Sequence, residues 1–170
     1  MPRILVVLFG LLLSWQAFAG DAPISLTVSA ASSLTNAFGE IAPLFEAQHP
    51  LVKVQLNFGA SGALLQQIAQ GAPVDVFASA DQGTMDQAQM QNLVKATERQ
   101  NFASNSLVVI VPVAAQHSPE NLQDLTQPVY ARIAIGVPAS VPVGRYSKKV
   151  LEAAGVWSVI EPKMIGAQNV

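Results

Sequence analysis

Residues 24–48 read ISLTVSAASSLTNAFGEIAPLFEAQ, and two periodicities follow one another within this stretch. Apolar and polar residues alternate over residues 24–30, which is typical of a half-buried strand. Residues 34–48 then repeat apolar side chains at helical spacing, with Pro43 expected to kink or shorten that helix. A strand that runs directly into a helix is the unit from which parallel sheets are built.

The rest of the chain repeats this alternation. Further strands are expected at residues 52–58, 74–78, 106–113 and 132–137. Further helices are expected at residues 63–70, from residue 82 into the Gln-rich stretch that ends at residue 100, and at residues 145–154. We expect Asp81 to cap the second of these helices and Gly155 to end the third. Strands that alternate with helices predict an α/β protein with parallel sheets.

The expected elements fall into two groups. Residues 24–90 form a compact β-α-β-α-β unit, and the polar residues 97–105 suit a crossover between domains. We therefore expect a first α/β lobe over residues 20–105 and a second over residues 106–170. The second group holds only two clear strands, too few to stand alone, and residues 166–170 resemble a loop entering a helix. The expectation is that the second lobe is incomplete and that the sequence is a fragment.

The N-terminus has the pattern of a secretory signal peptide. Arg3 precedes the apolar run ILVVLFGLLL at residues 4–13, and Ala17-Phe18-Ala19 provides an A-x-A cleavage signal. The run is about half the roughly 20 residues that a transmembrane helix needs. We expect residues 1–19 to be removed after Ala19 and the mature protein to be periplasmic. The sequence contains no Cys, which excludes a lipid-modified Cys, a disulfide scaffold and a thiolate metal site.

The composition and motifs argue against several classes of function. The formal net charge is −2 and there is no Lys/Arg run, so nucleic-acid binding is not expected. His49 precedes Pro50 at a helix exit and His117 lies in a polar loop, and both are interpreted as surface residues. Gly59-Ala60-Ser61-Gly62-Ala63 misses the G-x-S-x-G pattern by one position. A secreted serine hydrolase using Ser61 therefore stays a distant alternative, and we expect no enzyme.

Short runs of small and hydroxyl residues recur where a strand gives way to a helix. They occupy residues 30–34, 58–62 and 137–144, with a fourth candidate at residues 166–170. The start of a helix carries unpaired N–H donors and a partial positive charge, so several such starts around one crevice can bind an anion without charged side chains. Ordinary N-capping by Ser is the competing interpretation. The adjacent Gly and Ala residues favour a ligand that approaches the backbone closely.

Five segments together resemble the periplasmic molybdate-binding proteins, which are the solute receptors of ABC-type molybdate importers. They are SAASSLTNAF at residues 29–38, GASGAL at residues 59–64, DVFASAD at residues 75–81, NSLVV at residues 105–109 and VPVGRY at residues 141–146. Any one of these motifs is weak, but five in register along the mature chain are specific.

The resemblance implies a two-lobed periplasmic-binding-protein fold of type II, with a cleft between the lobes that closes on molybdate or tungstate. In this family pattern Ser33 and Ser61 donate hydroxyl and backbone N–H bonds from the first lobe. Val143, where the family often has Ala, and Val170 donate backbone N–H bonds from the second. The family's fifth donor, a Tyr hydroxyl, lies beyond residue 170, and Tyr146 is expected to be a packing residue instead.

The resemblance also implies a function, a ligand and a membrane partner. It would bind the oxyanion, with molybdenum present only in that form, and deliver it to the membrane permease of an ABC importer. No cofactor, no direct protein–metal ligand and no nucleic acid are expected, and the protein is expected to be a monomer. Another tetrahedral oxyanion such as sulfate is the alternative ligand. Arg145 is interpreted as a solvated residue on a helix face, and Asp75 as a partner of nearby backbone or Lys.

Overall fold

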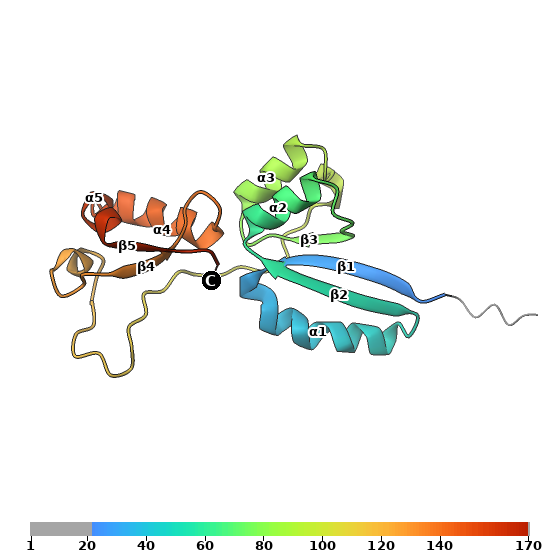
Figure 1. Cartoon of the computed structure of the whole chain (residues 1–170), viewed down its shortest axis with the longest axis horizontal. Coiled ribbons are helices and arrows are strands. Elements are labelled where there is room, and N and C mark those ends of the chain that lie inside the picture. The colour runs from blue at the N-terminus through green and yellow to red at the C-terminus, as the bar shows by residue number, and fades with distance from the viewer. Residues whose placement is uncertain (1–21, 170) are drawn as a thin grey trace, which may run out of the picture.

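The computed structural model describes residues 22–169 and arranges them around two parallel sheets (Figure 1). The first sheet has the order β2-β1-β3, with β1 at Ile24–Ala31, β2 at Val52–Gly59 and β3 at Val76–Ala78. The second pairs β4, Ile133–Gly136, with β5, Met164–Ala167. We call the parts of the chain around these sheets the first and second lobes. The predicted α/β class is confirmed, and the predicted signal peptide lies outside the described residues.

Helices cover both faces of the first sheet (Figure 1). The 3-10 turn η1, Ser32–Leu34, leads into α1, Thr35–Gln48, which lies on one face. On the other face lie α2, Ser61–Ala69, and α3, Gln82–Met90, followed by the 3-10 turn η2, Ala96–Glu98. The core of this lobe is formed by Val28, Ala30 and Ala78, with Leu26, Leu34, Phe38, Val54, Leu56 and Phe58 packed against them.

Two helices in this lobe differ in part from expectation. Helix α1 matches the predicted range of 34–48 to within one residue and continues through Pro43, so of the two effects expected of Pro43, a kink or a shortening, the shortening is wrong. Pro43 carries no N–H, so one hydrogen bond of the helix is missing there while the helix continues to Gln48. Helix α2 begins at Ser61, two positions before the predicted start at Ala63.

The second lobe is built around α4, Pro142–Ala153. Before it lies the 3-10 turn η3, Gln123–Thr126, and after it come α5, Trp157–Ile160, and the 3-10 turn η4, Glu161–Lys163. A buried cluster joins these elements to β4 and consists of Leu125, Ile135, Leu151, Val156 and Ile160. Gly155 has a φ of 71° just after α4, which confirms its predicted role in ending that helix. Pro142 occupies the first helical turn, where its missing N–H costs nothing.

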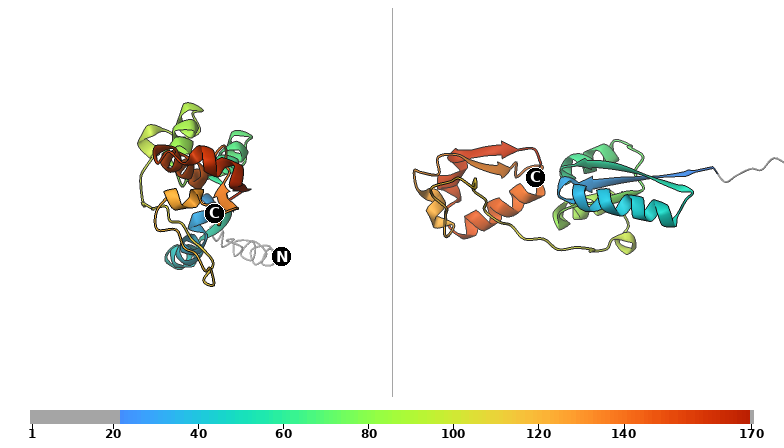
Figure 2. Two further views of the ribbon diagram at one scale, coloured as in Figure 1. Left: turned by 90° about the vertical axis from the view of Figure 1, so that its left-hand side faces the viewer. Right: turned by 90° about the horizontal axis from the view of Figure 1, so that it is seen from below.

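The prediction of a buried strand at residues 106–113 is wrong. The structure gives these residues no regular secondary structure, and Val108 and Ile110 are 78% and 85% exposed. A strand forms only where a neighbour completes its hydrogen bonds, and β4 pairs instead with β5, whose last two residues fall within the expected loop at residues 166–170. Residues 106–113 belong to the long connection that runs between the two lobes (Figure 2).

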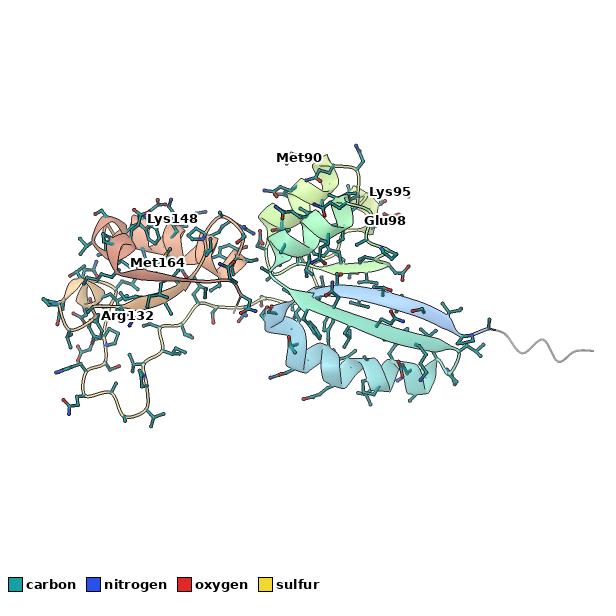
Figure 3. All side chains as sticks on the ribbon, in the orientation of Figure 1. Met90, Lys95, Glu98, Arg132, Lys148 and Met164 are labelled. Carbon is teal, nitrogen blue, oxygen red and sulfur yellow. The ribbon has the colours of Figure 1, made fainter. Side chains whose placement is uncertain are left out.

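Carboxylates connect neighbouring segments within the first lobe. Thr27 donates its backbone N–H to Asp75 Oδ2 at 2.8 Å, and the Asp75 N–H returns a bond to the Thr27 carbonyl at 3.0 Å. Asp75 is thus a backbone partner, as predicted. Val54 donates its backbone N–H to Glu46 at 2.8 Å, and this bond, with the Lys53 ammonium at 3.0 Å, lowers the pKa of Glu46. A comparable pair joins Lys95 to Glu98 past the end of α3 (Figure 3).

A close backbone approach sets the start of α4. A Cβ built on Gly144 would lie 2.0 Å from the Gly136 carbonyl oxygen and 2.9 Å from the Pro138 nitrogen. Real Cβ atoms never come so near to backbone, so only Gly fits at position 144. The end of β4 and the first turn of α4 are therefore held against each other.

We expect Gly144→Ala to destabilise the protein by about 3 kcal/mol or more, because the added methyl group must displace backbone. Gly39→Ala is the matched control, since a Cβ at Gly39 in α1 meets nothing within 4 Å. That change should raise stability by about 0.5–1 kcal/mol through helix propensity. Urea unfolding of both variants measures the difference, and equal stabilities would contradict the close approach.

We also expect a pH dependence from Glu46. Its folded-state pKa lies below the ordinary value of 4.5, so its stabilising contribution is complete above pH 4.5 and disappears as the pH falls through the folded pKa. Glu46→Gln should therefore flatten the decline of the urea midpoint below pH 4.5. Glu40→Gln removes a charge from the same helix and serves as control. A wild-type slope in the Glu46 variant would refute the assignment.

Candidate functional site

A cavity of about 900 Å³ is lined by residues of both lobes. The ends of β1, β2 and β3 contribute Ser33, Ser61 and Ser79 from the first lobe, and the start of α4 contributes Val143 from the second. Three of the four predicted anion donors, Ser33, Ser61 and Val143, thus line the same cavity. The fourth, Val170, lies outside the described residues.

The pairing of the strands explains why these residues meet. Ala31 on β1 pairs with Gly59 on β2, and Ala30 on β1 pairs with Ala78 on β3. The three parallel strands therefore end level, and the segments that follow them emerge side by side at one edge. Ligands of open α/β sheets bind at this carboxyl edge.

Ser61 is the most enclosed of the predicted donors, with no exposed surface. Its Oγ accepts a hydrogen bond from the Ala80 N–H at 3.0 Å. A hydroxyl group has one proton and two lone pairs, so this bond occupies a lone pair and leaves the proton to be donated elsewhere. Ser61 is also the first residue of α2, where backbone N–H groups lack partners inside the helix.

The other two described donors, Val143 and Ser33, differ in how exposed they are. Val143 is half-buried in the first turn of α4, where the first intrahelical bond is that of the Arg145 N–H to the Val141 carbonyl. Its own N–H is therefore one of the unpaired donors of the helix start. Ser33 lies in η1 just before α1 and is exposed.

Sequence reasoning missed an ion pair across the two lobes. Arg145 Nη2 lies 2.7 Å from Asp81 Oδ2 and 2.8 Å from Thr84 Oγ1. The Asp81 side chain is 4% exposed and that of Arg145 is 32% exposed. The interpretation of Arg145 as a solvated helix-face residue is therefore wrong. Asp81 also accepts the Thr84 N–H at 2.8 Å, which confirms its predicted role as the cap of α3.

The charges around the cavity are internally compensated. Among the described residues that line it, only Asp81 and Arg99 carry a formal charge. Asp81 pairs with Arg145, while Arg99 lies 2.6 Å from Asp86. Apart from these paired charges, the cavity is lined by neutral residues, in which serine hydroxyls and helix starts lie among apolar side chains.

Other chemistries find little support in residues 22–169. This part of the chain contains no group of three or more His, Asp or Glu side chains that could hold a metal ion. It also contains no helix long and apolar enough to cross a membrane. His49 stacks on Phe45 with ring centroids 4.4 Å apart, at the far end of α1. The hydrogen bond that the structure gives to Ser61 Oγ comes from a backbone amide, and neither His49 nor His117 lines the cavity that contains Ser61.

Known proteins resemble this chain in sequence and in fold. The chain is 38% identical to the molybdate-binding protein ModA of Escherichia coli (strain K12) over 149 residues, which cover 85% of this chain and 58% of that protein. The substrate-binding domain of a putative molybdenum ABC transporter from Clostridium difficile superposes with a TM-score of 0.60 at 34% identity. That match covers 86% of this chain and 63% of the other.

A third likeness concerns the fold alone. The sulfate-binding protein SubI of Mycobacterium tuberculosis H37Rv has a TM-score of 0.69 at 16% identity, covering 86% of this chain and 58% of that one. The chain therefore spans about three fifths of the length of these relatives.

The family comparison covers nearly all of the described chain. The model of the family described as bacterial extracellular solute-binding protein matches residues 26–170. The match includes both sheets and every element that lines the cavity. With its two lobes and the cavity that both of them line, the chain belongs to the bacterial extracellular solute-binding proteins.

Proposed function

We propose that this protein binds molybdate or tungstate in the periplasm and delivers it to the membrane permease of an ABC importer. The observation that carries the proposal is the convergence of the starts of α2 and α4 on one cavity, with Ser61 and Val143 at those starts. The 38% identity to a protein named for molybdate binding supports this choice of ligand.

The donor set suits a tetrahedral dianion. Molybdate is fully deprotonated near neutral pH, so it accepts hydrogen bonds and offers no proton to an acceptor. Ser61 has its proton free to donate, and the helix starts add unpaired N–H groups and a partial positive charge. Neutral donors hold such an ion without a fixed cation, which favours its later release to a transporter.

Ser33 and Ser61 would donate from the first lobe, with Val143 and Val170 from the second, across a boundary near residue 105. Residues 1–19 would direct export and be cleaved after Ala19. The protein would act as a monomer, without catalysis or cofactor. Sulfate is the competing tetrahedral dianion, and the size of the closed cavity would discriminate against it.

Thermal unfolding of the mature full-length protein tests the choice of ligand. Molybdate at about 100 times its dissociation constant should add roughly 2.7 kcal/mol to the free energy of unfolding and raise the melting temperature. Sulfate at the same concentration should leave it unchanged. A shift with sulfate equal to that with molybdate would reject the proposed specificity, and no shift with either anion would reject the proposed function.

Substitution of the serines tests the site. Ser33→Ala and Ser61→Ala should each weaken molybdate binding by about 1–3 kcal/mol in calorimetry, because each removes a hydrogen bond to a charged group. Ser33 is exposed, so its variant should keep wild-type stability, which separates binding from folding. Ser158→Ala, on an exposed position of α5, is the control. Wild-type affinity in both site variants would remove these residues from the site.

A further inference from the structure

We propose that Arg145 is a positioning residue that locks the two lobes together and so limits how fast the bound oxyanion escapes. The inference rests on the proposed function for its ligand. It concerns a contact between the lobes, made by a side chain that is not among the proposed anion donors.

The acidic side of the contact is rigid. Asp81 Oδ1 accepts the Thr84 N–H at 2.8 Å, and Oδ2 accepts the Thr84 hydroxyl at 2.8 Å. Asp81 and Thr84 are both buried, so the carboxylate is fixed to the first turn of α3. Arg145 meets a preformed acceptor and adds bonds to Asp81 Oδ2 and Thr84 Oγ1.

The basic side of the contact moves with the proposed site. Arg145 is in the first turn of α4, two positions after Val143 and one after Gly144. Gly144 packs on the end of β4, so this turn and the sheet of the second lobe form one unit. Pulling Arg145 away from Asp81 therefore also moves the Val143 N–H away from the first lobe.

A second contact between the lobes lies beside Ser61. A Cβ built on Gly62, in the first turn of α2, would lie 2.8 Å from the carbonyl oxygen of Ser140, which precedes α4. The lobes thus approach so closely here that any side chain at position 62 obstructs them. The ion pair and this backbone contact lie next to the proposed donors Val143 and Ser61 respectively.

The negative charge of Asp81 makes the contact between the two lobes depend on Arg145. Asp81 is among the residues that line the cavity, so its negative charge lies close to the space proposed for the dianion. With Arg145 in place the charge of Asp81 is compensated. Without Arg145, joining the lobes buries an uncompensated carboxylate, whereas separating them returns that carboxylate to water. Loss of the guanidinium therefore favours separated lobes.

Stopped-flow kinetics of molybdate release from the full-length protein test the inference. Arg145→Met should raise the dissociation rate by about tenfold or more and change the association rate much less. Lys149→Met is the matched control, because it removes a positive charge from an exposed position of the same helix. Its dissociation rate should stay near that of the wild type.

Asp81→Asn distinguishes an ion pair that joins the two lobes from simple repulsion between the Asp81 carboxylate and the anion. Asn can still cap α3, and the change removes a negative charge from the lining of the cavity. If charge alone matters, the variant binds molybdate more tightly. If the ion pair joins the lobes, the dissociation rate rises despite the lost repulsion, which is the expected result. Tighter binding, or an unchanged dissociation rate, overturns the inference.

Gly62→Ala probes the neighbouring contact without removing a charge. Ala favours the helical conformation of α2, so the first lobe should stay folded, while the methyl group meets the Ser140 carbonyl and accelerates release. Gly39→Ala makes the same chemical change in α1, where nothing lies within 4 Å, and should leave release unaltered. Equal release rates in the two variants would contradict the close contact.

Small-angle X-ray scattering distinguishes failure of the lock from failure of the proposed function. Without added anion, Arg145→Met should have a larger radius of gyration than the wild type and the Lys149 control. Equal radii overturn the lock. Should the wild type fail to bind molybdate, the proposed function falls, and the scattering comparison alone decides whether Arg145 joins the lobes.

Discussion

Parallel strand pairing is the constraint on which the rest of this molecule depends. Each strand must be followed by a crossover before the next can pair, so the chain turns into a helix at the same edge of the sheet every time. Because β1 pairs with β2 from Ile24–Val52 to Ala31–Gly59, both strands end level. The start of a helix has unpaired N–H groups, and level strand ends gather several such starts in one place. The cavity is a consequence of that register.

The second lobe has the same arrangement of parallel strands followed by a helix start, built from fewer residues. Gly136 on β4 pairs with Ala167 on β5, and the first turn of α4 packs directly on the end of β4 through Gly144. Each lobe thus presents helix starts to the same space. Hydrogen-bond donors reach the cavity through the backbone, and this explains why small residues rather than charged ones dominate the turns that line it.

Periodicity and capping signals in the sequence predicted many of the helices and strands. The features that they did not predict depend on contacts between residues far apart in the sequence. The alternation at residues 24–30, the helical spacing after residue 34 and the cap at Asp81 are properties of neighbouring residues, and the structure has them. The apolar run at residues 106–113 looks like a strand by composition, but only a partner strand makes one, and β4 has β5. The pairing of Arg145 with Asp81 joins positions 64 residues apart, so no periodicity signals it.

The exposed run at residues 106–113 has a consequence for handling the protein. Leu107, Val108, Val109 and Ile110 are exposed, carry no charge and are mostly β-branched. Short segments with high β-propensity and low charge are those that pair with copies of themselves when nothing covers them. Among residues 22–169, this connecting segment therefore places four consecutive exposed apolar residues where a second copy could pair with them, and a charged substitution there is a way to reduce aggregation.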